Sequence, residues 1–330
     1  MCDVVYLCVT STYEYRTRLV KGFLKDRRES LFHMRWERFD PSALQPLPAS
    51  AKDDRMIRKI LRFTKIEHTA FSLPLLFTGA WLGGEGHWPP VRVLSLIVAA
   101  SVGARIVGMS LNRIFDRHLD ARNPRTAKRE LPSGAMHLST ALAVTGAGLV
   151  LYLSACALLN RWCLYLSPIP LIPLIGYSLL KRITAWCHFG IGLCLAMAPL
   201  GAYVAAAGHP RFSGEALLFS GFVLFWLSGA DIIYALMDIE SDRRNGVHSL
   251  PAWLGLRGAL WAAAASHLAA LAFLMVLLTA VHAGAAAFAA FAVTVVLFAT
   301  IHLPAIPVPQ RFFPLASLAG MAGSITPILA

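Results

Sequence analysis

Two short stretches of the sequence carry acidic side chains four residues apart. In the first, Asn112, Asp116 and Asp120 follow one another at this spacing. Residues i, i+4 and i+8 of an α-helix drift by only about 80° in total, so these three side chains share one face. In the second stretch, Asp238 and Asp242 have the same spacing. Two acidic helix faces predict a site for divalent metal ions.

Both acidic stretches are also rich in basic residues. The first contains Arg113, Arg117, Arg122, Arg125, Lys128 and Arg129, and the second contains Arg243 and Arg244. These charges would weaken a site for a cation alone, just as the carboxylates would weaken a site for a phosphate alone. The combination suits a diphosphate bridged by Mg²⁺. Mg²⁺ binds through one or two carboxylates plus phosphate oxygens, while Arg and Lys neutralise the remaining charge.

Such a site favours the departure of a diphosphate group. Two facing carboxylate clusters can hold metal ions on either side of one diphosphate and make it a better leaving group. An apolar cavity beside the site would accept a long hydrocarbon tail. Together these parts predict the ionisation of a prenyl diphosphate to an allylic cation.

The composition places this chemistry in a membrane. The chain has 330 residues, of which 57% are hydrophobic and 15% charged, whereas soluble domains carry about 25% charged residues. Long apolar runs separate the charged clusters, which predicts an all-α, polytopic membrane protein. The net charge of +12 does not indicate nucleic-acid binding, because the basic residues lie in the N-terminal segment and in short loops. They fit cytoplasmic loops and affinity for anionic lipid or phosphate.

The apolar runs predict about nine membrane-spanning helices. Their approximate ranges are 68–82, 91–111, 137–158, 162–180, 188–207, 214–236, 258–280, 283–302 and 312–330. The loops after the second, fourth and sixth spans hold the excess of basic residues, so these loops are expected on the cytoplasmic side together with both acidic stretches. Arg125 and Arg129 are either ordinary charges of such a loop or residues that order it over the site.

The first part of the chain has a different character. Residues 1–54 are mixed in charge and contain no long apolar run. We expect either a cytoplasmic extension of unknown role or a start codon assigned too early. Residues 55–330 are expected to form the membrane domain.

The charged stretches resemble the motifs of a known family. NRIFDRHLD, residues 112–120, is similar to the NxxxDxxxD motif of the UbiA superfamily of intramembrane prenyltransferases, and DIESD, residues 238–242, resembles its DxxxD motif. The similarity runs from about Lys65 to the C-terminus. It implies nine helices in a UbiA-like bundle around a central cavity that is open sideways to lipid. It also implies Mg²⁺, a polyprenyl diphosphate donor and an aromatic acid acceptor, in an integral protein of the bacterial inner membrane with its active site facing the cytoplasm.

The wording around the motifs resembles one branch of this superfamily. KIEHTAFSLP, NRIFDRHLDARNPRTAKRELPSG and DIIYALMDIESDRRNGVHSLPAWLG are similar to enzymes that prenylate 1,4-dihydroxy-6-naphthoate in the futalosine route to menaquinone. The 4-hydroxybenzoate enzymes of ubiquinone synthesis more often have Asp directly after the motif Asn, where this chain has Arg113. The resemblance therefore favours the naphthoate acceptor.

The resemblance also implies roles for individual residues. One Mg²⁺ would be held by Asn112, Asp116 and Asp120, and the other by Asp238 and Asp242, with Asp116 and Asp238 central to catalysis. The diphosphate would be contacted by Arg113 and Lys181, with Arg62 and Lys65 as further candidates.

Three residues near the expected site have two interpretations each. Asp231 lies about two turns deeper than Asp238 in its helix, where a charge is costly and marks a role. This role is either a structural hydrogen bond, with Tyr234 as the candidate partner, or handling of the acceptor. Glu67 and His68 are either an interfacial pair or contacts to the acceptor.

Two other functions remain open. The first keeps the reaction and changes the acceptor to 4-hydroxybenzoate or another phenol. The second is a membrane transporter with an intramembrane ion site. Transporters place ionisable residues near the membrane midplane, and here the acids cluster at one surface, which favours the enzyme.

Overall fold

The structure, a computed structural model, describes residues 49–65 and 69–330, and in these residues every regular element is helical. This confirms the all-α prediction. Contacts within the chain divide it into Met1–Arg55 and Met56–Ala330, and the helical bundle belongs to the second unit. The interpretation of residues 1–48 lies outside the described residues, and residues 49–54 form the start of the first described helix.

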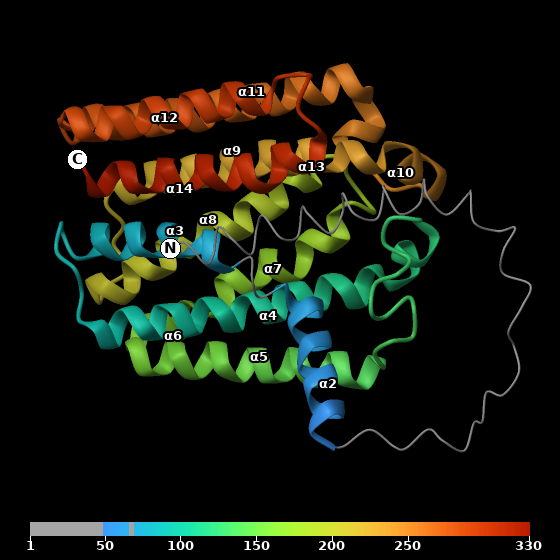
Figure 1. The fold of residues 1–330 in the computed structure, drawn as a ribbon. Helices are drawn as coiled ribbons and strands as arrows, with labels where there is room; N and C mark the ends of the chain where they lie inside the picture. The colour runs from blue at the N-terminus through green and yellow to red at the C-terminus, as the bar shows by residue number, and fades with distance from the viewer. Residues whose placement is uncertain (1–48, 66–68) are drawn as a thin grey trace, which may run out of the picture. The chain divides into compact units, whose positions relative to one another are not determined.

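Figure 1 shows the arrangement of the helices. In chain order the elements are α2 (Ala49–Thr64), α3 (Thr69–Gly83), α4 (Val91–Arg122), α5 (Leu138–Leu159), α6 (Arg161–Leu166), α7 (Pro168–Leu180), α8 (Cys187–Ala207), α9 (Gly214–Ala235), η3 (Leu236–Asp238), α10 (Ile239–Asn245), α11 (Leu250–Ala280), α12 (Ala285–Ile301), α13 (Val308–Gln310), η4 (Arg311–Ala316), α14 (Ser317–Ile325) and η5 (Thr326–Ile328).

Several of these helices are suited to a bilayer. Within the described residues, six segments are long and apolar enough to cross a membrane, and they are Val91–Arg122, Leu138–Leu159, Arg161–Leu180, Cys187–Ala207, Gly214–Asn245 and Leu250–Ala280. Two more of the expected spans form the shorter helices α3 and α12, of 15 and 17 residues. The last expected span is divided among η4, α14 and η5. The membrane character is thus borne out, and the count of nine spans stays a prediction.

The span expected at 162–180 is two helices. Pro168 has no backbone N–H to donate to the carbonyl of Leu164, and α6 ends just before it. The hydroxyl of Ser167 donates to that carbonyl at 2.8 Å, and the carbonyl of Ser167 accepts from the hydroxyl of Tyr152 at 3.0 Å. The break is therefore satisfied internally, as a break inside a membrane must be.

Helix α11 begins earlier than the sequence suggested. It starts at Leu250 and continues through a kink at Gly255, whose φ of 71° is in the left-handed region that glycine adopts without a steric penalty. The apolar run at 258–280 is the part beyond this kink. The kink leaves the first turn of α11 beside the second acidic motif.

Helix α9 carries the centre of the hydrophobic core. Its Phe219, Phe222 and Trp226 stack in sequence, with ring centroids 5.9 and 6.1 Å apart. All three are almost fully buried, and the indole N–H of Trp226 donates to the carbonyl of Ala316 at 2.9 Å. Helix α9 packs along α8 and α11, and α14 lies beside it in Figure 1. Because α9 leads directly into Asp238, this packing fixes where the second acidic motif begins.

Gly320 of α14 tests this packing. A Cβ at Gly320 would lie 1.9 Å from an indole carbon of Trp226, so Gly320→Ala should destabilise the detergent-solubilised protein by about 1–3 kcal/mol. The measurement is the thermal unfolding midpoint. Gly201→Ala in α8 is the control, since no heavy atom lies within 4 Å of a Cβ there. The control should be neutral or more stable by up to about 1 kcal/mol. Equal midpoints for the two variants would show that the tight contact between α9 and α14 is absent.

Candidate active site

The first acidic motif lies on one continuous helix, as its spacing predicted. Helix α4 runs unbroken to Arg122, and Asp116 and Asp120 are both buried on it. The Nζ atom of Lys181, the residue that follows α7, donates to Oδ2 of Asp116 at 2.6 Å. The side-chain amide of Asn112 donates to the same oxygen at 3.0 Å. The structure thus brings these predicted site residues together across two helices.

The loop after α4 folds back over this motif. Nη1 of Arg129 donates to both carboxylate oxygens of Asp120 at 2.8 Å. Thr126 adds a bond from its hydroxyl to the carbonyl of Asp120 at 3.0 Å. The guanidinium of Arg113, which is buried, lies 3.9 Å from Glu130 of the same loop. Arg129 thus ties the loop to the first motif, which fits the interpretation in which it orders the loop, and its role over a site stays a prediction.

The second motif is not on a regular α-helix, contrary to the sequence expectation. The chain passes through the 3₁₀ turn η3, and Asp238 has φ −113° and ψ 4° before α10 begins. This is the sparsely populated bridge region, where many active-site residues lie. Asp238 and Asp242 are therefore on different helical segments, and the argument that they share a helix face is wrong. The turn instead aims Asp238 at the loop after α4.

Asp238 is held by that loop. Oδ1 of Asp238 accepts from the amide of Asn123 at 2.8 Å and from Nε of Arg125 at 2.9 Å, and Nη2 of Arg125 pairs with Oδ2. Nη1 of Arg125 donates to the hydroxyl of Tyr234 at 2.9 Å. Burial lowers the pKa of Arg125, but its hydrogen bonds to Asp238 outweigh this and leave the pKa above the ordinary value. These contacts place both acidic motifs at the same end of the bundle (Figure 1).

Asp231 has a partner that the sequence analysis missed. Nδ1 of His188 and Oδ2 of Asp231 are 2.7 Å apart, so Tyr234, which binds Arg125, is not the partner of Asp231. Nε2 of His188 accepts from the backbone N–H of Leu250 at 3.3 Å. In the neutral ring, Nδ1 therefore carries the hydrogen, and this N–H donates a hydrogen bond to Asp231. A signal was present, because His188 begins one expected span and Asp231 lies near the matching end of the next.

Asp242 is linked to the start of α11. The hydroxyl of Ser249 donates to Oδ2 of Asp242 at 2.8 Å and also accepts from the backbone N–H of Ala252 at 3.2 Å, which caps α11. His188 holds the next residue, Leu250. The start of α11 is thus joined to Asp242 by Ser249 and to Asp231 by His188.

Arg62 and Lys65, two further predicted site residues, lie at the end of α2. Arg62 is exposed in the last turn of α2, and Lys65 follows this helix with a φ of 50°. Phe63 between them is buried in a cluster that includes Ile114 of α4, so α2 reaches the side of the first motif. Glu67 and His68 lie outside the described residues. The diphosphate contacts assigned to Arg62 and Lys65 stay predictions.

The donor atoms of the two motifs fit Mg²⁺ in kind. Among the described residues, no three His, Cys, Asp or Glu side chains come together as a metal site, because cationic side chains pair with the carboxylates instead. Oδ1 of Asp116, however, is buried and has no hydrogen-bond partner within this part of the chain. A buried carboxylate oxygen without a partner is costly, and Mg²⁺ prefers such oxygen ligands. The set of Asn and Asp oxygens is therefore suitable for this ion.

The profile described as the UbiA prenyltransferase family matches residues 72–311. This chain belongs to the UbiA prenyltransferase family. A relative, a 4-hydroxybenzoate octaprenyltransferase of Coxiella burnetii, is 27% identical over 191 residues, which are 58% of this chain and 66% of the relative. The match thus spans just under two thirds of that relative's length.

Two solved structures of UbiA homologues are similar in fold. The apo structure of a homologue from Aeropyrum pernix K1 has a TM-score of 0.70 and 37% sequence identity, and the match covers 79% of this chain and 96% of that one. A homologue from Archaeoglobus fulgidus bound to GPP and Mg²⁺ has a TM-score of 0.59 and 18% identity, with 82% of this chain and 100% of that one covered. The second likeness shows the UbiA fold alone.

Arg125 tests the link between the two UbiA motifs. A lysine in place of Arg125 keeps the charge but cannot span both oxygens of Asp238 and reach Tyr234 as well. Arg125→Lys should therefore lower the rate of prenyl transfer by about 10- to 100-fold, the usual effect of disturbing a residue that orients metal ligands. The control is Arg244→Lys, because Arg244 pairs with Glu240 on the exposed face of α10 and should tolerate the change. Equal rates in both variants would contradict the role of Arg125.

His188 tests the anchoring of α11. His188→Phe removes the donor to Asp231 and the acceptor for Leu250, and leaving such groups unsatisfied costs about 1–3 kcal/mol each. We expect a lower thermal unfolding midpoint for this variant. His188→Asn keeps an N–H near the position of Nδ1 and should recover part of the loss. If the Phe variant unfolds at the wild-type temperature, His188 does not anchor α11.

Proposed function

We propose that this protein transfers a polyprenyl group from a polyprenyl diphosphate to an aromatic acid in quinone biosynthesis, with Mg²⁺ as the cofactor. The observation that carries the proposal is the pairing of Asp238 with Asn123 and Arg125, which brings the second acidic motif against the loop that follows the first. Carboxylates and cations then gather at one end of an apolar bundle, as departure of a diphosphate requires.

Each group of residues has a role in this proposal. Asn112, Asp116 and Asp120 would hold one Mg²⁺, and Asp238 and Asp242 the other. The bound ions would neutralise the diphosphate and favour its departure, and a homologue of the same fold, from Archaeoglobus fulgidus, is bound to GPP and Mg²⁺.

The basic residues of the site would receive the diphosphate. Lys181 and Arg113 are its nearest candidates, with Arg62 and Lys65 on the side of α2. Lys181 already pairs with Asp116, so it is positioned where the charge of the substrate would arrive. The carbon–oxygen bond of the donor breaks, a ring carbon of the acceptor attacks the allylic cation, and that carbon loses its proton. The apolar walls of the bundle would keep water from the cation.

For the acceptor we propose 1,4-dihydroxy-6-naphthoate, which places the enzyme in menaquinone synthesis. The support is the resemblance of the three stretches around the motifs to that branch, together with Arg113 after the motif Asn. The second candidate is 4-hydroxybenzoate, and the name of the Coxiella burnetii relative favours it.

We further propose that residues 55–330 form the catalytic domain in a bacterial inner membrane, with the site on the cytoplasmic side. The loop after α4 and the residues that follow α7 and α9 carry the basic excess, and such loops face the cytoplasm. Protease protection in inverted and right-side-out vesicles tests this orientation.

Asp116 and Asp238 test the site itself. Asp116→Ala and Asp238→Ala should each lower prenyl transfer at least about a hundredfold, because each removes a carboxylate that would hold the metal. Purified variants should still insert into membranes and elute as the wild type does. Glu240→Ala is the control, since Glu240 lies between the two acids of the second motif but is exposed. Retained turnover in both Asp variants would overturn the proposed function.

The acceptor is decided by a direct comparison. Solubilised protein receives Mg²⁺, a long polyprenyl diphosphate and either 1,4-dihydroxy-6-naphthoate or 4-hydroxybenzoate, and the prenylated product is measured by mass spectrometry. We expect product with the naphthoate alone. Product with 4-hydroxybenzoate alone would transfer the assignment to ubiquinone synthesis and leave the metal site as proposed.

A further inference from the structure

Helix α2 has an exposed side that carries two different stripes of side chains. Phe63 is buried against the bundle, whereas Ile57 and Leu61 are 55% and 43% exposed, and Arg58 and Arg62 are exposed as well. At 3.6 residues per turn, Ile57 and Leu61 form one stripe along the helix, and Arg58 and Arg62 form another about 100° further round. The exposed side of α2 is therefore apolar along one edge and basic along the other.

The charge of this helix end has a single sign. From Arg55 to Lys65 the sequence contains five basic residues and no acidic residue. Helices that present basic side chains beside exposed apolar ones lie in the membrane interface, with the apolar side chains at the acyl chains and the basic ones at anionic headgroups. An anionic lipid is therefore a partner that matches both stripes.

The part of α2 that follows Met56 lies at the ends of membrane spans. Phe63 packs in a cluster with Ile114 of α4 and Ala141 of α5, and Figure 1 shows α2 crossing these two helices rather than running along them. Ala141 is in the first turn of α5, and Ile114 lies just beyond the apolar run at 91–111. A helix that crosses spans at their ends is at the depth of the lipid headgroups.

The inner side of α2 holds the loop after α4. Nζ of Lys59 donates to the carbonyl of Ala135 in this loop at 3.2 Å. Leu131 of the same loop packs in the cluster that α2 forms with α4 and α5. The loop also supplies Arg129, which binds Asp120 of the first motif. An interaction that fixes α2 would therefore also fix the loop that pairs with the first motif.

We propose that the exposed side of α2 binds anionic phospholipid, with Ile57 and Leu61 at the acyl chains and Arg58 at the phosphate, and that this contact holds the loop after α4 against the first motif. A free phosphate has no acyl chains to cover the apolar stripe, so the partner is a lipid of the bilayer. The inference goes beyond the proposed function, because it requires a membrane but no prenyl transfer.

Stabilisation by added lipid tests the binding. The full chain in neutral detergent receives phosphatidylglycerol or phosphatidylcholine with the same acyl chains, and the thermal unfolding midpoint is followed against lipid concentration. Phosphatidylglycerol should raise the midpoint at the lower concentration. Arg58→Gln should increase the phosphatidylglycerol concentration required roughly fivefold, the effect of one basic charge near an anionic surface. Arg58→Lys keeps the charge and should respond as the wild type does.

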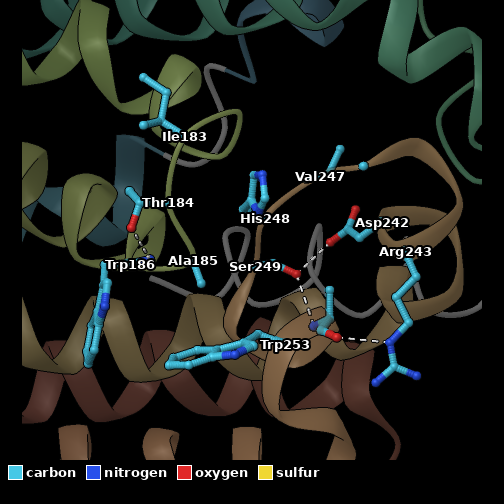
Figure 2. A pocket seen from close by; sticks show the side chains of 12 residues that line it. Ile183, Thr184, Ala185, Trp186, Asp242, Arg243, Val247, His248, Ser249 and Trp253 are labelled. Carbon is cyan, nitrogen blue, oxygen red and sulfur yellow. Dashed lines mark hydrogen bonds between the residues drawn. The ribbon is translucent and has the colours of Figure 1, made fainter.

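Two further variants separate this surface from the net charge of the protein. Ile57→Ser combined with Leu61→Ser keeps the charge, removes the apolar stripe and should weaken the response to phosphatidylglycerol at least roughly tenfold. Arg243→Gln is the control, because it removes the same charge as Arg58→Gln, but Nε of Arg243 donates within the protein to the carbonyl of Ala252 at 2.9 Å (Figure 2). The control should respond as the wild type does. Equal losses in Arg58→Gln and Arg243→Gln would overturn the proposal.

Hydrogen exchange tests the coupling to the loop. The full chain is placed in nanodiscs of phosphatidylcholine, with or without phosphatidylglycerol, and exchange of the backbone amides is measured by mass spectrometry. Phosphatidylglycerol should slow exchange in residues 123–137 severalfold in the wild type and not in Arg58→Gln. Residues 208–213, which join α8 to α9, should exchange equally in both lipids. Equal exchange of residues 123–137 in both lipids would refute the coupling.

Other occupants of this surface give different results. If a second copy of the chain covers α2, the double serine variant will convert a dimer to a monomer in light scattering and keep the response to phosphatidylglycerol, which overturns the proposal. If inorganic phosphate stabilises the wild type as phosphatidylglycerol does, the acyl chains are not needed and the proposal also fails. None of these readouts uses prenyl transfer, so the proposed function is decided separately by its own variants and acceptors.

Discussion

The arrangement of the site depends on the neutralisation of buried carboxylates by cations from other segments. Asp116 is paired with Lys181, Asp120 with Arg129, and Asp238 with Arg125. Removing a carboxylate from water is expensive unless a partner of opposite charge and hydrogen bonds accompany it. Each pair therefore restricts where its loop or helix end can lie. The loop after α4 has no helix of its own, and these pairs together with Asn123 give it a defined course.

The helices make these pairs possible because they hold the acidic side chains at fixed positions along the bundle. Helix α4 is continuous, so its three motif residues stay on one line toward α7 and the loop. Helix α9 is held by stacked aromatic rings against α14, and its end at Asp238 follows from that packing. The short turn η3 then redirects the chain, and Asp238 turns toward Asn123 and Arg125. Core packing thus fixes the position of α9, and charge pairing fixes the direction of the chain at its end.

Features with a local cause could be predicted from the sequence. The shared face of Asn112, Asp116 and Asp120 needs only helical periodicity, and the basic loops need only the positions of charges between apolar runs. The turn at Asp238 could not be read from its spacing, because it depends on the tertiary contacts of Arg125. The hydrogen bond between His188 and Asp231 joins α8 and α9. In the sequence, only the positions of the two residues near matching ends of their expected spans indicated it. The prolines within 162–180 indicate a break between two helices. The break is tolerated because the hydroxyl of Ser167 donates to the carbonyl of Leu164.

The same charge pairs also explain how a site rich in carboxylates can exist before substrate binds. Four carboxylates in one place would repel one another. Lys181, Arg129 and Arg125 offset this repulsion at Asp116, Asp120 and Asp238 because they occupy carboxylate oxygens, and all three are partly exposed, so they can turn toward an arriving anion. Among the described residues, Oδ1 of Asp116 is the exception, since it is buried and has no hydrogen-bond partner there. A metal ion held there, as proposed, would displace no hydrogen bond of that oxygen.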